Sequence, residues 1–475
     1  MIFSSLTFIL LFLPGTFVLS RLVSAAGGRT AENALLLAVI LLFYAWGEPH
    51  YILLMLISIA ANWCFGMLLD HGHSHEDIGK KGTENLITAA SIAFNLGLLV
   101  YFKYANLLVM TFGSSHLRES WSEVHLPVGI SFFTFQAMSY VIDVRRGICK
   151  TQRNPFKLAL YISFFPQLIA GPIVKYSDID EQIEGREMTR DAAVYGFRRF
   201  AYGLGKKVLL ANALGSVADH IYAIPSYQRT WVMAWFAAIA YTFQIYYDFS
   251  GYSDMAIGLG SMFGFHFKEN FLYPYTSVSV REFWRRWHIS LSSWFRDYVY
   301  IPLGGNRKGA VKTYRNLFIV FCLTGIWHGA SWTFLVWGLY HGFFIVMERA
   351  LTGKYLSKVP AIGYIYTGLT VIVGWVIFRC ETLGDAFSMI DCMFRPWKHL
   401  ASPYSVWEWV DHRTILLFVC ALLGMGVLQR CLEGTSVAKE GAGSRKEKVY
   451  LLLIALFSFL GIVADTYNPF LYFRF

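Results

Sequence analysis

A histidine, His328, lies in the run TGIWHGASW (residues 324–332), and almost every neighbour from Asn316 to Met347 is apolar. An ionisable side chain is costly to place in a membrane segment, and such residues usually face the protein interior or an aqueous path. An imidazole can take up and return a proton near neutral pH, as the activation of a hydroxyl nucleophile requires. His328 is therefore a candidate general base, while the commoner role of a lone buried histidine is a structural hydrogen bond to a neighbouring helix.

A second histidine, His288, lies in the aromatic and basic segment REFWRRWHISLSSWFRDYVY, residues 281–300. If this segment is one helix, its aromatic face carries Trp284, Trp287, His288, Leu291 and Phe295. One interpretation is an amphipathic helix at the lipid headgroups, where Trp and Arg are common. The other is a binding site, because cations and ring faces together suit a phosphate-rich, nucleotide-bearing donor that enters from the cytoplasm.

Residues near these two histidines are candidates to line a donor site or a tunnel. They are Trp284, Arg285, Trp287, Ser290, Trp294, Trp327 and Asp248. Asp248 lies beside an apolar run in YYDFSGYSDMA, and the favoured interpretation is an ion pair inside the helix bundle, with Arg285 or Arg286 as partner. The alternative is that Asp248 tunes a histidine.

The other histidines and the cysteines do not predict a metal site. His341, in WGLYHGFF, is expected to be structural. His71, His73 and His75 have the spacing i, i+2, i+4, but they lie in a short polar loop without a well-defined ligand set, so we predict no bound metal. The seven cysteines are scattered, mostly within or beside apolar runs, and no pair has metal-ligand spacing. The sequence also contains no serine elbow, P-loop or H-E-x-x-H motif, which argues against a soluble acyltransferase or ATPase.

Membrane helices must position these residues. Of the 475 residues, 56% are hydrophobic and only 15% are charged, with a mean hydropathy of +0.45, which is too apolar for a soluble globular protein. Apolar runs recur, and we predict an all-α polytopic membrane protein with about eleven or twelve spans plus re-entrant or interfacial helices. The runs begin at Ile2, Asn33, Tyr51, Leu86, Leu126, Arg199, Thr230, Asn316, Trp332, Tyr364, Thr414 and Val449.

The net charge of +10 follows the expected membrane topology. With the N-terminus outside, the cytoplasmic loops carry most cations, including Lys80, Arg145, Arg349 and Arg445, and the opposite loops carry few. The charge therefore indicates orientation and not nucleic-acid binding. Because no basic residues precede the first apolar run, we expect a retained first helix and not a cleaved signal peptide.

The chain reads as one integral membrane domain, residues 1–475, with an unusual segment at 244–312. This segment is too polar for a lipid-facing span, too aromatic for a solvated loop, and interrupted by several glycines and prolines. Irregular backbone at membrane depth is tolerated where protein buries it or where it lines a cavity. We therefore expect a re-entrant or interfacial element that forms the wall of a site.

Several long motifs resemble the membrane-bound O-acyltransferase superfamily and, within it, the bacterial branch typified by the membrane subunit of alginate O-acetylation. The motifs are LPVGISFFTFQAMSYVIDVRRG (126–147), YISFFPQLIAGPIVKY (161–176), YDFSGYSDMAIGLGSMFGF (247–265), NFLYPY (270–275), FWRRWHISLSSWFRDYVYIPLGGNR (283–307), TGIWHGASWTFLVWGLYHG (324–342) and NPFLYFRF (468–475). Together they extend over essentially the whole chain.

This resemblance implies a multi-helix bundle around a central funnel, with His328 as the buried catalytic histidine and His288 in the same tunnel. It implies an acyl thioester donor in the cytoplasm, either acetyl-CoA or an acyl carrier protein, and no permanently bound cofactor. It also implies delivery to the outer side of a bacterial cytoplasmic membrane, through an exported or membrane-anchored acyltransferase partner that modifies a polysaccharide or cell-wall polymer.

From these observations we expect an O-acyltransferase that moves an acyl group, most simply acetyl. In this hypothesis His328 removes the proton of an acceptor hydroxyl, which attacks the thioester, and His288 either donates to the oxyanion or orients the thioester arm. Transfer of D-alanine from a carrier protein to an anionic cell-wall polymer is the alternative within the same class. A transporter or proton pathway is the alternative from another class, although no inverted repeat is visible.

Overall fold

The computed structural model describes residues 2–72, 78–168, 171–356, 358–427, 444–464, 467–469 and 471. These residues form helices and connecting segments without a β-strand, and the predicted all-α multi-pass architecture is confirmed. In this part of the chain six helices are long and apolar enough to cross a membrane, by length and composition. They are Phe8–Gly47, Ile52–Asp70, Lys81–Phe112, Trp332–Leu351, Pro360–Arg379 and Arg445–Ala464.

Six such helices are fewer than the eleven or twelve predicted spans. The difference arises because other apolar runs form helices that are shorter or carry polar residues. The helix α5 (Ile130–Arg145) has 16 residues, and α11 (Trp231–Met262) is long but carries Gln244, Asp248 and Asp254 along its length.

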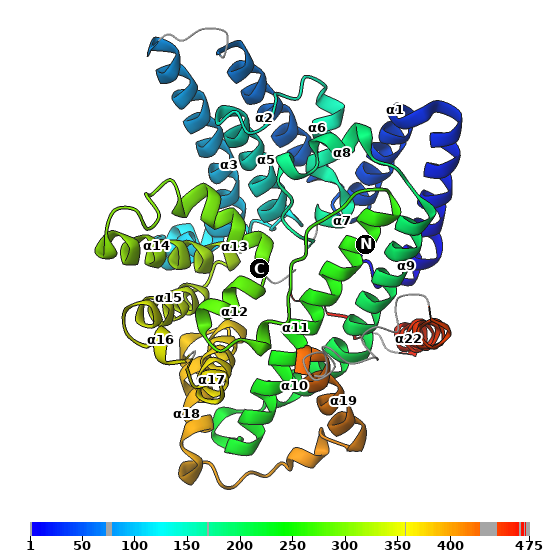
Figure 1. Ribbon diagram of the computed structural model, residues 1–475. Coiled ribbons are helices and arrows are strands. Elements are labelled where there is room, and N and C mark those ends of the chain that lie inside the picture. The colour runs from blue at the N-terminus through cyan, green and yellow to red at the C-terminus, as the bar shows by residue number, and fades with distance from the viewer. Residues whose placement is uncertain are drawn as a thin grey trace. The chain divides into compact units, whose positions relative to one another are not determined.

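The contacts between residues divide the chain into two compact units. Unit 1 comprises residues 1–200 and 253–268. Its helices are α1 (Leu13–Gly47), α2 (Ile52–Gly72), α3 (Ile78–Phe112), α4 (Ser115–Ser120), α5, α6 (Pro155–Ser163), α7 (Phe165–Leu168) and α8 (Asp180–Gly185). The bend of α1 in Figure 1 lies at Gly28, whose φ of 69° a glycine adopts without strain.

Buried amides hold α2 and α3 together in unit 1. Asn62 Nδ2 donates to Asn95 Oδ1 at 3.1 Å, and Asn95 Nδ2 donates to Asn62 Oδ1 at 2.8 Å. Ser91 donates to the same Asn62 oxygen at 3.1 Å. Polar side chains inside a membrane bundle are stable when they bond across helices in this way.

Unit 2 comprises residues 201–252 and 269–475. Its helices are α10 (Ala213–Ala223), α12 (Val280–Arg286), α13 (Ile289–Phe295), the π-helix η6 (Arg296–Tyr300), α14 (Ala310–His328), α15 (Trp332–Met347), α16 (Gly353–Leu356), α17 (Pro360–Arg379), α18 (Leu383–Phe394), α19 (His412–Leu422) and α22 (Arg445–Ala464). The helices α9 (Arg190–Gly205) and α11 each contribute residues to both units.

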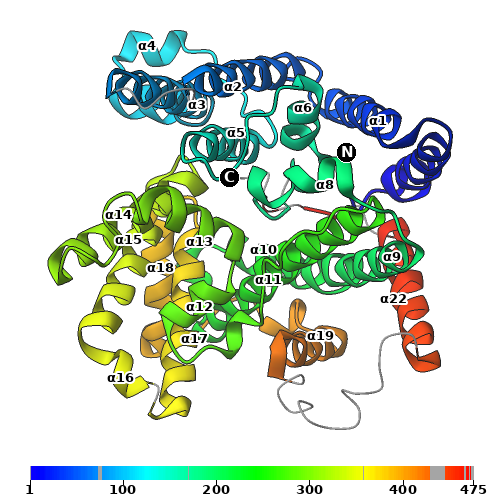
Figure 2. The same cartoon turned by 45° about the horizontal axis from the view of Figure 1, so that its top comes forward.

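The pair α14 and α15, side by side in Figures 1 and 2, packs closely because glycines face each other. A Cβ on Gly325 would clash with the Phe334 carbonyl, and one on Gly338 would clash with the Phe321 carbonyl. A Cβ on Gly329 would enter the Phe334 ring. Gly325 and Gly329 therefore allow close approach of α15 beside His328.

The core of unit 2 is a cluster of tryptophans in which α12, α15 and α17 meet. The Trp287 and Trp375 rings lie 4.8 Å apart between centroids, Trp284 and Trp337 lie 5.4 Å apart, and Trp337 stacks on Trp375 at 6.0 Å. Offset and edge-on contacts of this kind add to the stability that comes from burying large rings. The cluster fixes the position of α12, which leads into His288.

Candidate active site

A cavity of about 270 Å³ in unit 2 brings together a histidine, a tryptophan and four arginines. It is enclosed by α12, α13, η6, α14 and α15 and is lined by Arg281, Trp284, Arg285, His288, Leu291, Ser292, Phe295, Arg296, Tyr300, Leu317, Val320, Phe321, Thr324, Ile345 and Arg349. Its arginines are exposed, whereas His288 and Trp284 are buried. The cavity therefore has a basic opening and an aromatic wall that carries a histidine.

His288 lies at a break between two short helices, so the prediction of one helix over residues 281–300 is wrong. The helix α12 ends at Arg286, and His288 adopts a left-handed conformation with φ 45° before α13 begins at Ile289. A non-glycine residue in this region is strained and persists when its surroundings hold it. The break separates α12 from α13, and residues on both sides of it, from Arg281 to Arg296, line the cavity.

The His288 side chain is 1% exposed and packs against rings from other parts of unit 2. The Phe249 centroid lies 4.6 Å from the imidazole centroid, and that of Trp327 lies at 6.3 Å. Burial lowers the pKa of the imidazole to about 3, well below its ordinary value, because the charged form loses its hydration. His288 is therefore neutral at pH 7.

Asn270 bonds to His288 and to the first residues of α13 after the break. Its backbone carbonyl accepts from Ile289 N at 3.0 Å, and its side-chain Oδ1 lies 3.2 Å from His288 Nδ1. The same oxygen accepts from Ser290 N at 3.1 Å and from Ser290 Oγ at 2.8 Å. Asn270 was not among the predicted site residues, because it lies eighteen residues from His288 in the chain and no local motif marks it.

His328 is the last residue of α14 and is 5% exposed. Its ring lies in contact with three others, at centroid distances of 5.1 Å to Trp327, 5.0 Å to Trp337 and 5.2 Å to Phe378. Trp327 thus lies between the two histidines and contacts both rings. The structure brings His288, Trp327 and His328 into one buried cluster, with Thr324, one turn before His328, at the cavity wall.

The arginines of the cavity differ in their charge partners. Arg296 forms a salt bridge with the adjacent Asp297 at 2.7 Å. Arg285 and Arg349 form no salt bridge with a residue that the structure describes. A guanidinium that is not already neutralised is a strong site for phosphate or carboxylate, because its donors match two oxygens at once.

The remaining candidates lie outside the cavity lining. Trp287 packs against Phe283 and Trp375 in the core, and Trp294 packs against Tyr298 at 5.1 Å. Ser290 Oγ donates to Asn270 Oδ1 and lies 3.3 Å from His288 Nδ1. The cavity wall therefore contains His288, Trp284 and Arg285 of the predicted set, together with Arg281, Arg296 and Arg349.

Asp248 forms the predicted buried ion pair, but with Lys207 and not with Arg285 or Arg286. The Lys207 Nζ and Asp248 Oδ1 atoms lie 2.6 Å apart, with both side chains almost fully buried. Both partners also hold the end of the chain, because Lys207 donates to the Pro469 carbonyl and Asp248 accepts from Leu471 N at 3.0 Å. Arg286 pairs with Glu282 at 2.7 Å. Asp248 therefore anchors the C-terminal segment.

Among the residues that the structure describes, no histidine other than His288 and no cysteine lines the cavity. His341 is fully buried among the rings of Trp284, Trp337 and Tyr340, and neither ring nitrogen bonds to a described residue. The side chains of His71, His73 and His75 lie outside the described residues. Among the residues described, no group of three metal-ligating side chains occurs, and the six described cysteines are free thiols.

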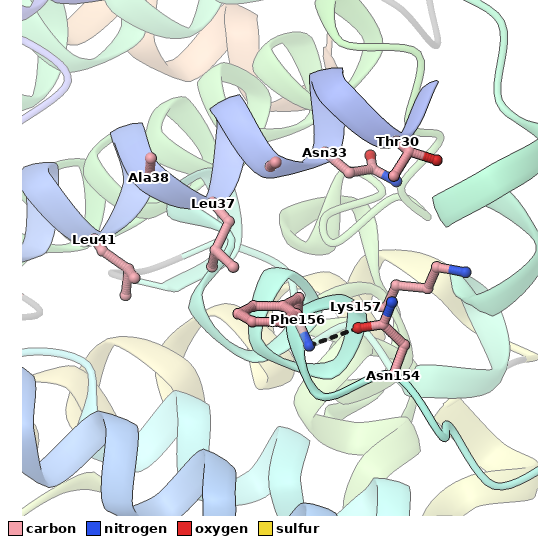
Figure 3. A pocket seen from close by; sticks show the side chains of 9 residues that line it. Thr30, Asn33, Leu37, Ala38, Leu41, Asn154, Phe156 and Lys157 are labelled. Atoms are coloured by element: carbon pink, nitrogen blue, oxygen red, sulfur yellow. Dashed lines mark hydrogen bonds between the residues drawn. The ribbon is translucent and has the colours of Figure 1, made fainter. Parts of the chain in front are cut away.

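Unit 1 contains a second cavity, of about 360 Å³, with a different lining. Six of its residues come from α1 and three from the start of α6. Figure 3 shows Thr30, Asn33 and Lys157 at one end and Leu37, Ala38 and Leu41 further along α1. Its one cation, Lys157, is paired with Glu184.

The chain is similar to known proteins along its length. The model of the MBOAT, membrane-bound O-acyltransferase, family matches residues 149–381. A probable alginate O-acetylase of Pseudomonas putida is 39% identical over the whole of both chains. A peptidoglycan O-acetyltransferase of Helicobacter pylori is 34% identical over 83% of this chain and 80% of its own. A teichoic acid D-alanyltransferase of Bacillus subtilis is 31% identical over 45% of this chain and 56% of its own.

Proposed function

The chain belongs to the membrane-bound O-acyltransferase family, and we propose that it transfers an acetyl group to hydroxyl groups of an extracellular or cell-wall polysaccharide. As a member of this family it is a multi-pass membrane enzyme, an O-acyltransferase. Relatives that match most or all of the chain are named for O-acetylation of alginate or peptidoglycan, and this supports acetyl as the group and a glycan as the acceptor.

The observation that carries the donor side of the proposal is the cavity of unit 2, in which exposed arginines surround a buried histidine. The donor is an acyl thioester, acetyl-CoA or an acyl carrier protein, whose phosphates bind at Arg285 and Arg349. Arg349 lies near the end of the helix Trp332–Leu351, at the end that the positive-inside pattern assigns to the cytoplasm, so the donor enters from that side. The thioester arm then extends along Trp284 towards His288.

The chemical step is attack of an acceptor hydroxyl on the thioester carbonyl. His328 accepts the hydroxyl proton, the oxygen forms the new ester bond, and the thiol leaves with a proton. The rings of Trp327, Trp337 and Phe378 around His328 exclude water, which protects the thioester from hydrolysis. His288 and Trp284 hold the donor arm beside this centre.

The acceptor side involves a partner protein. We place the enzyme in the bacterial cytoplasmic membrane, where an exported or membrane-anchored acyltransferase receives the acetyl group and modifies the polymer. D-alanyl transfer from a carrier protein is the second candidate function, favoured by the match to a teichoic acid D-alanyltransferase over 45% of the chain. That match covers less of the chain than the matches to O-acetyltransferases.

A donor test separates these functions. The purified protein in proteoliposomes is supplied on the cytoplasmic face with acetyl-CoA, with an acetylated carrier protein, or with a D-alanyl carrier protein, and consumption of each thioester is measured with and without the exported partner. We expect acetyl consumption that His328→Ala abolishes. If the protein consumes only the D-alanyl carrier protein, the transferred group is D-alanine and not acetyl. Unchanged glycan O-acetylation after deletion of the protein, with loss of a solute flux, would establish the transporter instead.

A further inference from the structure

The tautomer of His288 follows from the atoms around its Nδ1. Two oxygens lie within hydrogen-bond distance of this nitrogen: Asn270 Oδ1 at 3.2 Å and Ser290 Oγ at 3.3 Å. A neutral imidazole carries one hydrogen, so one nitrogen donates and the other accepts. The tautomer of His288 therefore depends on whether these two oxygens donate a hydrogen bond to Nδ1 or accept one from it.

The orientation of the Asn270 amide is fixed by a backbone group. The atom near His288 also lies 3.1 Å from Ser290 N, and a backbone N–H can only donate. The side-chain atom at this position must accept, so it is the amide oxygen and not the NH₂ group. Asn270 is fully buried, and α13 begins directly at this bond, so the orientation is also held by the start of that helix.

The direction of the Ser290 hydroxyl hydrogen bond is fixed by Asn270. Its Oγ lies 2.8 Å from Asn270 Oδ1, and since that oxygen has no hydrogen, the hydroxyl proton must lie between the two. Both oxygens thus present lone pairs to His288 Nδ1, which must carry a hydrogen. Burial, which lowers the pKa of His288 to about 3, keeps the ring neutral, so Nε2 carries none.

We infer that Asn270 is a positioning residue that holds His288 as the Nδ1–H tautomer, so that Nε2 accepts a hydrogen bond from the bound substrates and does not donate one to the thioester oxyanion. The role in acyl transfer rests on the proposed function, whereas the tautomer does not. Of the two roles that the sequence left open for His288, orientation of the donor arm is then the one that fits, because a bare nitrogen cannot stabilise an oxyanion.

The tautomer is tested first without any turnover. Protein labelled with ¹⁵N-histidine in detergent micelles at pH 7 gives the protonation state of each ring nitrogen, and His288→Gln identifies the His288 signals by their loss. We expect a hydrogen on Nδ1 in the wild type and in Asn270→Asp, whose carboxylate still accepts from both donors. We expect its partial or complete transfer to Nε2 in Asn270→Ala. A hydrogen on Nε2 in the wild type, or no change in Asn270→Ala, would overturn the inference.

The same variants are then compared in acetyl transfer from acetyl-CoA. Asn270→Ala should lower kcat by roughly 10- to 100-fold, the size seen when the partner that orients an imidazole is lost. Asn270→Asp should restore most of kcat and shift the acidic limb of the pH profile upwards, because a carboxylate favours the imidazolium. Asn316→Ala is the matched control, since Asn316 is also fully buried and donates to Leu303 and Gly305 carbonyls. It should lower stability and leave kcat per folded molecule unchanged.

These outcomes separate the inference from the proposed function. If wild-type protein carries the hydrogen on Nδ1 but transfers no acetyl group, the tautomer stands and the proposed function fails. If acetyl transfer proceeds and Asn270→Ala lowers it no more than Asn316→Ala does, the positioning role of Asn270 is wrong even though the function holds.

Discussion

The arginine-lined cavity of unit 2 and the cavity along α1 in unit 1 are similar in size and opposite in chemistry. The cavity of unit 2 is lined by four arginines and a buried histidine, and the cavity of unit 1 is lined mainly by one face of α1, with a single cation that Glu184 already neutralises. The residues of α1 that line it, from Thr30 to Leu41, follow the bend at Gly28 and belong to an unbroken stretch of helix. The wall of the other cavity is a broken helix with a strained residue at the break.

The difference shows how a membrane bundle creates a reactive site. A continuous helix presents side chains at fixed angles and leaves its backbone satisfied, so its grooves are apolar surfaces suited to lipid or packing. His288 lies at a helix break and His328 at a helix end, and both imidazoles are buried. At the break, Asn270 accepts hydrogen bonds from the backbone N–H groups of Ile289 and Ser290. Size alone therefore does not identify the functional cavity, whereas irregular backbone with buried ionisable groups does.

The largest expected effect on this comparison comes from His328→Ala. Loss of a general base typically costs about 10²- to 10⁴-fold in rate, so glycan O-acetylation should fall to background while the protein remains in the membrane. The measurement is extracellular O-acetyl content, normalised to membrane abundance of each variant. His341→Asn serves as the matched control, because His341 is also a buried histidine outside the cavity lining but has no role in the proposed chemical step. Full acetylation by His328→Ala would remove His328 from the mechanism.

Next in size is the effect of Asp248→Asn, which tests whether this residue belongs to the cavity or to the scaffold. Removing one partner of a buried ion pair leaves the Lys207 charge uncompensated and costs about 3–5 kcal/mol. We expect lower abundance and a lower melting temperature in detergent, with normal kcat for the folded fraction. The double variant Lys207→Met with Asp248→Leu should recover much of the loss. A lower kcat at normal stability would mean that Asp248 takes part in the reaction and is not only a structural residue.

A smaller effect, on substrate affinity, is expected for Arg285→Ala and Arg349→Ala. Each change removes a charge-assisted contact to the donor, worth roughly 1.5–3 kcal/mol, so KM for acetyl-CoA should rise about tenfold or more with kcat little changed. Because these arginines are exposed, the difference from wild type should shrink at high salt. Lys157→Ala in the cavity of unit 1 is the control and should leave KM unchanged. Equal effects of all three changes would mean that the basic opening does not bind the donor.

How far the sequence anticipated the site can be judged from His288 and Asn270. His288 stood out because an imidazole among tryptophans and arginines is unusual, and the cavity wall contains it. The helical face predicted for residues 281–300 failed because periodicity assumes an unbroken helix, and no local residue type announces a left-handed histidine. The conformation depends on Asn270, a partner far along the chain, and only tertiary structure reveals such a contact.

The membrane fold shows the same limit. Apolar runs identified several helices of the bundle, since α1, α2 and α3 are long and apolar enough to cross a membrane. The runs in α11 and α14 were also predicted to span the membrane, but neither helix is among the six that length and composition select, and α11 carries several buried polar residues. The partner of Asp248 was missed for a related reason: Lys207 lies in another helical run, and its charge gave no sign of being buried.

The free energy of unfolding should depend on pH through His288, which lines the cavity of unit 2, whereas the cavity of unit 1 contains no histidine. In the folded protein burial keeps His288 neutral down to a pKa of about 3, whereas in the unfolded chain the ring gains a proton below about pH 6.5. The unfolded state therefore binds more protons as the pH falls, and the free energy of unfolding should decrease by about 2 kcal/mol between pH 6.5 and 5 from this residue. Thermal melting against pH measures it, and His288→Gln should flatten the slope. An unchanged slope in that variant would mean that His288 is not the group responsible.

The smallest effects are expected in the cavity of unit 1, for Leu37→Met and Phe156→Leu. Phe156 is 70% exposed and the first change conserves volume, so each should cost less than about 1.5 kcal/mol of stability. Neither residue contacts a group that binds or transfers an acyl chain, so O-acetyl content per folded molecule should stay within about twofold of wild type. A tenfold loss of acetylation at normal abundance would show that this apolar cavity takes part in the reaction, and that the contrast with the basic cavity does not separate scaffold from site.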